Sequence, residues 1–129
     1  MAPSHPIDLL AARLPIVAEW WAGYRADPTF DPVLRRLHLA ELSRFLLNEA
    51  REGALPDQAR FCQVLESVLT DADPDTDDTV ALSVIEEFIV NGPTHGIDAQ
   101  RLYDDLGPIA RSHWQDLYKY IRHEPWAAA

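Results

Sequence analysis

The sequence predicts an all-α fold, either a compact bundle or a curled stack of about six helices in the manner of a helical-repeat fragment. Apolar residues recur every three or four positions along almost the whole chain, and no segment shows the strict alternation of a half-buried strand. Proline, glycine and clustered acidic residues fall between the periodic segments, where turns are expected. The 129 residues, 47% of them hydrophobic, are enough for one core.

The first helical segment is expected over residues 7–24. Pro15 interrupts it on the side opposite the apolar residues, so the pattern predicts either one kinked helix or two short helices in phase. Asp27 and Pro28 mark the end of the segment. Its apolar arc consists of Ile7, Leu10, Leu14, Val17, Trp21 and Tyr24.

A second helix is expected over about residues 32–52. Asp31 is interpreted as its N-cap, Pro32 occupies its first position and Gly53 follows its end. Because its apolar residues spread around nearly the whole circumference, this helix is predicted to be central and contacted from several sides. These residues are Val33, Leu34, Leu37, Leu39, Leu42, Phe45, Leu46 and Leu47.

Two further helices flank the acidic, turn-rich segment 71–78. The earlier one covers about residues 57–70, and the later one ends at Asn91 and Gly92. Each carries one stripe that is expected to face the core. The stripes are Phe61, Cys62, Leu65, Val68 and Leu69 in the earlier helix, and Val80, Ala81, Val84, Ile85, Phe88 and Ile89 in the later one.

The carboxyl-terminal part predicts a short helix and then a longer one. The short helix, about residues 98–105, begins at the N-cap Asp98 and stops at Gly107. The last helix begins near Pro108 and ends before Pro125. Its expected buried residues are Ile109, Ala110, Trp114, Leu117, Tyr118 and Ile121.

Length and charge exclude several classes of protein. Residues 1–129 are expected to form a single domain with frayed ends at 1–6 and 126–129. The formal net charge of −10 at pH 7 repels phosphate backbones and anionic lipid, so we expect no nucleic-acid binding. No stretch approaches the about 18 apolar residues of a membrane span, and the amino terminus lacks a signal-peptide pattern. We therefore expect a cytoplasmic protein.

No motif indicates catalysis, so we expect a protein that is not an enzyme and has no cofactor. Cys62, the single cysteine, lies among apolar neighbours and is interpreted as a small core residue. The five histidines lack the spacing that places two imidazoles around a metal. His113 and Asp116 are interpreted as a solvated hydrogen-bonded pair, and the alternative is an acid–base pair acting with Glu66.

The acidic segment has the alternating carboxylates Asp71, Asp73, Asp75 and Asp77. A calcium loop also uses this alternation, but Thr76 stands where that loop needs glycine and Leu82 where it needs Glu. We therefore expect no metal. Asp75, Asp77 and Asp78 are interpreted as first-turn carboxylates that favour the positive end of the following helix.

The negative charge is regional. Residues 65–129 hold thirteen acidic and four basic residues, whereas residues 1–64 hold eight and seven. One interpretation is a solvated acidic face that keeps the protein soluble. The other is a docking surface for a basic partner, since complementary charge speeds association. Its residues would be Asp71, Asp73, Asp75, Asp77, Asp78, Glu86 and Glu87.

Several stretches also carry a family resemblance. They are Leu42-Ser43-Arg44-Phe45-Leu46, then residues 61–66, 84–89 and 103–108. In these stretches, residues 38–121 resemble a group of small all-helical bacterial proteins often found among toxin-immunity genes. The resemblance implies a non-enzymatic protein that binds and neutralises a cognate toxin.

The sequence therefore predicts an immunity or inhibitor protein that forms a one-to-one complex with a toxin of basic surface. The alternative is a scaffold or regulatory module that self-associates or binds a host protein through Trp20, Trp21 and the first helix. Adjacent residues on a helix lie about 100° apart, so one of these two tryptophans is expected to be partly exposed. Exposed aromatic residues are typical interface anchors.

Overall fold

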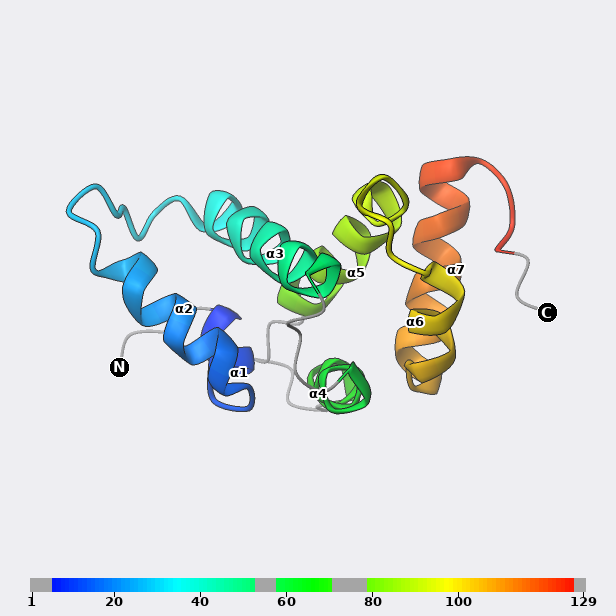
Figure 1. Ribbon diagram of the computed structural model, residues 1–129, viewed down its shortest axis with the longest axis horizontal. Coiled ribbons are helices and arrows are strands. Elements are labelled where there is room, and N and C mark those ends of the chain that lie inside the picture. The colour runs from blue at the N-terminus through cyan, green and yellow to red at the C-terminus, as the bar shows by residue number, and fades with distance from the viewer. Residues whose placement is uncertain (1–5, 53–57, 71–78, 127–129) are drawn as a thin grey trace.

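The computed structural model describes residues 6–52, 58–70 and 79–126, and within these ranges it contains helices and no strand (Figure 1). This confirms the all-α fold class. The helices are α1 (Pro6–Ala11), α2 (Pro15–Arg25), α3 (Arg35–Arg51), α4 (Gln58–Thr70), α5 (Thr79–Asn91), the short 3-10 helix η1 (Pro93–His95), α6 (Ala99–Asp105) and α7 (Pro108–Arg122).

The first predicted segment forms two helices in phase, α1 and α2. Each begins with a proline, which lacks a backbone N–H and is therefore favourable in the first turn of a helix. Leu14 lies between the two helices and still donates its backbone N–H to the Leu10 carbonyl at 2.8 Å, so the buried arc continues. Pro6 begins α1, and residues 1–5 of the end that is expected to fray lie outside the described residues.

Helix α3 begins at Arg35, three residues later than predicted. The Asp31 carboxylate accepts a hydrogen bond from the Val33 backbone N–H at 3.0 Å and closes a local turn instead of capping the helix. The Asp31 carbonyl is also engaged, because His38 Nε2 donates to it at 2.6 Å. A contact between a loop and the next helix therefore decides where α3 begins.

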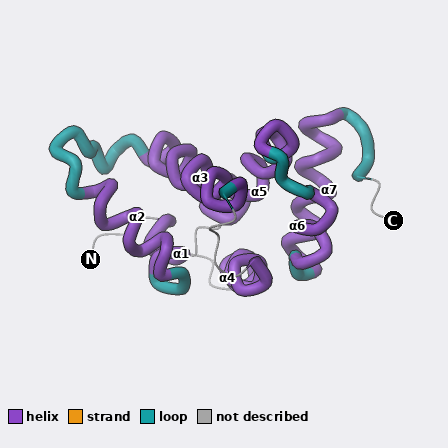
Figure 2. The backbone as a smooth tube through the Cα atoms, viewed as in Figure 1, coloured by secondary structure: helices purple, strands orange, loops and turns teal. Residues whose placement is uncertain are grey.

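Helix α5 takes the central position that the sequence assigned to the helix at 32–52. It packs against α1, α3, α4 and α7, and Figure 2 shows it between the α1–α3 part and the α6–α7 part of the molecule. Its whole predicted stripe is buried, as is that of α4 except for the half-buried Leu69. The start of α3 faces solvent, because Leu37 on its first turns and Val33 and Leu34 just before it are 48%, 80% and 47% exposed.

The carboxyl-terminal helices begin as predicted. Asp98 caps α6 by accepting a hydrogen bond from the Arg101 backbone N–H, and α7 begins at Pro108. One expectation is wrong here, because Ile109 in the first turn of α7 is 37% exposed instead of buried. Trp126, the first residue of the end that is expected to fray, is half-buried against the core, and residues 127–129 lie outside the described ranges.

Candidate functional site

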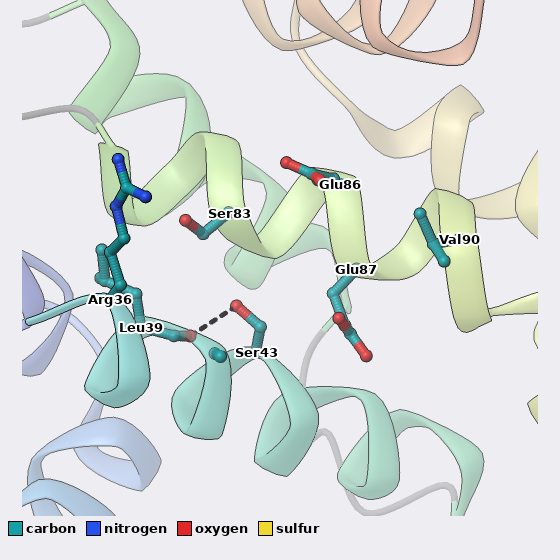
Figure 3. A pocket seen from close by; sticks show the side chains of 8 residues that line it. Arg36, Leu39, Ser43, Ser83, Glu86, Glu87 and Val90 are labelled. Carbon is teal, nitrogen blue, oxygen red and sulfur yellow. Dashed lines mark hydrogen bonds between the residues drawn. The ribbon is translucent and has the colours of Figure 1, made fainter. Parts of the chain in front are cut away.

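A cleft of about 500 Å³ lies between α3 and α5. Figure 3 shows its two walls, with Arg36 and Ser83 toward one end and Glu87 and Val90 toward the other. The cleft is built on the most extensive helix contact in the described structure, so both walls are held by a packed core. Its lining residues are Arg36, Leu39, Ala40 and Ser43 from α3, and Ser83, Glu86, Glu87 and Val90 from α5.

Apart from Arg36, the side chains on the α3 wall are uncharged, and those of Ala40 and Ser43 are also small. Ser43 is buried, and its hydroxyl donates to the Leu39 carbonyl one turn earlier at 2.8 Å. This hydrogen bond satisfies the hydroxyl inside the helix. Ala40 adds only a methyl group, so the space between the helices stays open.

Charged side chains lie at the rim of the cleft. Glu86 on α5 and Arg36 on α3 are both exposed, and neither has a hydrogen-bond or ion-pair partner among the described residues. Glu87 is half-buried and accepts a hydrogen bond from Asn91 Nδ2 at 2.7 Å, which fixes its carboxylate on the α5 wall. The rim can therefore offer one carboxylate and one guanidinium directly to a partner.

Two of the seven predicted docking residues belong to this cleft. Glu86 and Glu87 both line it from α5, and Figure 3 shows Glu87 pointing toward α3 and Glu86 pointing away from α3. Asp71, Asp73, Asp75, Asp77 and Asp78 lie outside the described residues. Arg36 is a further residue of the cleft that was not predicted. Its spacing from Ala40 and Ser43, four and then three positions, places the three residues on one helical face and was the available signal.

Two residues that were considered for catalysis, Cys62 and Glu66, have structural roles in the fold. Cys62 is buried, as predicted, and burial together with the nearby negative charge of Asp105 raises the pKa of its thiol to about 12. The Glu66 carboxylate accepts hydrogen bonds from the backbone N–H groups of Ile109 and Ala110, both at 2.9 Å. Glu66 is therefore engaged at the start of α7.

Neither a His113–Asp116 contact nor a metal site is found in the described ranges. No hydrogen bond or ion pair joins these two side chains there, although both lie on α7. In the same ranges, no three His, Cys, Asp or Glu side chains are grouped so that they could hold a metal ion. The aspartates of the calcium alternative lie outside them.

A smaller hollow of about 190 Å³ lies at the α2–α3 corner, which we define as residues 27–37. His38 borders it and is 1% exposed. Because a carbonyl can only accept, His38 Nε2 carries the proton that is donated to Asp31, and its Nδ1 lies 2.9 Å from the Tyr24 hydroxyl. Partial burial raises the pKa of Tyr24, and the negative charges of Glu41 and Asp27 raise it further.

Aromatic side chains of α2 and α3 pack together next to the corner. Trp20 is half-buried and stacks on Tyr24 and Phe45, with ring centroids 4.7 and 5.6 Å apart, while Trp21 is 2% exposed. This confirms that one of the two adjacent tryptophans is partly exposed. It also removes Trp21 from any interface, because its ring is part of the core.

Comparisons of the chain with protein families, with curated proteins and with solved structures find no match. Within residues 6–52, 58–70 and 79–126, no helix has both the length and the apolar character needed to cross a membrane. The functional conclusion therefore depends on the geometry and charge of this chain alone.

Proposed function

We propose that this chain is an inhibitor protein of the immunity type, which binds a toxin protein through the α3–α5 cleft and neutralises it. The observation that carries the proposal is the pair Glu86 and Glu87 on one wall of an open cleft, with the Glu86 carboxylate exposed and without a partner in the described structure. The partner would present a basic surface, in a one-to-one complex in the bacterial cytoplasm.

Charge supports this choice of partner. Concentrated like charge costs self-repulsion, and a basic surface relieves that cost while it speeds encounter. The cleft also selects among basic proteins, since Arg36 on the opposite wall repels a Lys or Arg that approaches it. A matching partner would place its cations against Glu86 and Glu87, and a hydrogen-bond acceptor against Arg36.

The test compares Glu86→Gln/Glu87→Gln with the unmodified chain as affinity baits in a lysate of the source bacterium. A protein retained by the unmodified chain is then purified and titrated against both forms at several salt concentrations. We expect the double variant to bind at least about tenfold more weakly, with a smaller salt dependence, because two charged contacts are lost. Inhibition of the partner's toxicity on co-expression checks the neutralising role.

Glu19→Gln is the matched control. Glu19 is an exposed residue of α2 outside the cleft, and its substitution removes one negative charge without changing either wall. We expect its affinity to stay close to that of the unmodified chain. Equal binding by the double variant and the unmodified chain would contradict the proposed function.

A self-associating scaffold is the second candidate, and one observation favours it. Three of the large apolar side chains that are exposed in the described structure, Val33, Leu34 and Leu37, lie within five consecutive positions. The surface first considered for this function, around Trp20 and Trp21, is not available as a whole because Trp21 is buried. The exposed apolar surface therefore lies just beyond the carboxyl end of α2, at the α2–α3 corner.

A further inference from the structure

The α2–α3 corner carries an apolar surface that the proposed function does not use. The exposed large hydrophobic residues of the described structure are Val33, Leu34, Leu37, Val90, Ile109 and Tyr120. The first three form a cluster and the others are scattered over α5 and α7. Single exposed apolar residues are ordinary, but a contiguous group beside a hollow is typical of an interaction site.

The shape of the corner suits a contact with another protein. Figure 1 shows the connection between α2 and α3 at one end of the long axis of the molecule, opposite α7. Val33 belongs to this connection and is 80% exposed, beside a hollow of about 190 Å³ that Leu34, Leu37 and Phe30 line together with polar residues, among them Asp27 and Asp31. The corner therefore has an apolar projection beside a depression of mixed apolar and polar lining.

The corner is also held in place. Asp27 accepts hydrogen bonds from the backbone N–H and the hydroxyl of Thr29, at 2.8 and 2.6 Å. Asp31 closes a second turn through its bond to Val33, and its carbonyl is tied to the buried His38. Because the backbone that presents Val33 is bonded on both sides, little conformational entropy is lost when the corner binds.

Charge decides which partner the corner fits. Residues 27–37 contain two acidic and two basic residues and are neutral, whereas the chain has a net charge of −10. Two copies of so acidic a chain repel one another over most of their surface, and the neutral corner is where they can approach. A strongly basic partner would gain no net electrostatic attraction there, and it would be drawn to the α5 wall of the cleft instead.

We propose that the corner binds a second copy of this chain in a two-fold symmetric contact, with Val33 of each copy in the hollow of the other. A two-fold contact needs a self-complementary surface, and a projection beside a matching depression meets that requirement. The contact is small compared with stable interfaces, so the dimer has a dissociation constant on the order of 100 μM.

Sedimentation velocity of the full chain over a range of concentrations tests this proposal. The unmodified chain sediments increasingly as a dimer as its concentration rises, and Val33→Asp weakens the dimer at least about tenfold because it places a carboxylate in an apolar contact. Val33 is exposed and precedes α3, so this variant keeps the fold, which its helical circular dichroism and melting temperature verify.

Tyr120→Asp is the matched control, because Tyr120 is equally exposed at 81% but lies on α7. It leaves the dimer unchanged. Raising the salt concentration from about 50 to about 500 mM strengthens the dimer by screening the repulsion between the two chains, whereas it weakens the binding of a basic partner. A failure of one contact is therefore distinguishable from a failure of the other.

Two results would overturn the proposal. One is a monomer at every concentration up to about ten times the expected dissociation constant. The other is a dimer that Val33→Asp leaves intact, or that Tyr120→Asp disrupts to the same extent.

Discussion

Glu66 joins α4 to the start of α7 through its carboxylate, whose two oxygens accept hydrogen bonds from the backbone N–H groups of Ile109 and Ala110. These groups belong to the first turn of α7 and have no partner inside the helix, and a negative charge is favourable at that end. We expect Glu66→Ala to lower the free energy of unfolding by about 1–2 kcal/mol in urea titrations. Asp116→Ala, on the exposed side of α7, is the control.

Gly107 gives an independent check of the same contact. A Cβ atom at position 107 would lie 2.5 Å from Glu66 Cδ, so a larger residue must displace this carboxylate. We expect Gly107→Ala to lower the free energy of unfolding by nearly as much as Glu66→Ala does. The same substitution should have a smaller effect in the Glu66→Ala background, and a double-mutant cycle should give a coupling of about 1 kcal/mol. Additive effects would show that a residue larger than glycine at position 107 does not act through the Glu66 carboxylate.

Cys62 is expected to be unreactive in the folded protein. Burial, with the negative charge of Asp105, raises the pKa of its thiol from 9.0 to about 12, and the thiolate is the reactive form. At mildly alkaline pH, thiol reagents should therefore modify Cys62 only when the chain is unfolded in denaturant. Rapid modification of the native protein would contradict this.

The same pKa shift sets a pH dependence for stability. The pKa of the Cys62 thiol is higher in the folded state than in the unfolded state. Its contribution to the free energy of unfolding is therefore fully present below pH 9.0 and is lost as the pH rises from 9.0 toward about 12. We expect the stability difference between the unmodified chain and Cys62→Ala to decrease above pH 9.0, by up to about 1 kcal/mol per pH unit. Urea titrations at several pH values measure it, and a difference that is constant with pH would refute this.

At the scale of elements, the segment after α7 is stabilised by one side chain. His123, with a φ of 59°, ends α7 and reverses the chain, and Trp126 then packs on Tyr118 and Trp114 with ring centroids 4.9 and 5.5 Å apart. We expect Trp126→Ala to cost about 1–3 kcal/mol, because a half-buried ring and its aromatic contacts are lost. Tyr120→Ala, on the exposed side of α7, should change stability by less than about 0.5 kcal/mol.

Most helices could be predicted from local sequence patterns. The predictions were wrong where contacts with residues farther along the chain decide the structure. The stripes of α4 and α5 could be predicted because each helix has one apolar face, and α6 because Asp98 is a strong cap. The start of α3 could not, since Asp31 is drawn into a contact with His38, seven residues away. Trp126 has no helical period to reveal its packing, which depends on rings of α6 and α7.

The candidate site was predictable in charge but not in shape. Glu86 and Glu87 follow from the outward arc of α5, because that arc is read directly from the sequence. The opposite wall depends on how α3 crosses α5, and Arg36 reaches the rim only through that packing. The apolar corner was missed for a related reason. Val33 and Leu34 precede α3, so the helical period did not apply to them.

At the scale of the whole molecule, acidic residues outnumber basic ones and give a formal net charge of −10. Between described residues, the structure has two ion pairs of Arg with Glu, Arg44–Glu41 and Arg51–Glu52, and both are exposed and local in sequence. Such pairs contribute little to stability. Repulsion between acidic side chains on different helices should therefore dominate the electrostatic part of the folding free energy at low salt.

We therefore expect NaCl to stabilise the fold. Between about 20 and about 500 mM NaCl the free energy of unfolding should rise by about 1 kcal/mol, because screening weakens repulsion in the compact state more than in the extended unfolded chain. Glu86→Gln/Glu87→Gln has two fewer negative charges and should show a smaller increase. Melting temperatures recorded at a protein concentration well below that of dimer formation separate this effect from self-association. A fall in stability with salt would mean that attractive pairs outweigh the repulsion.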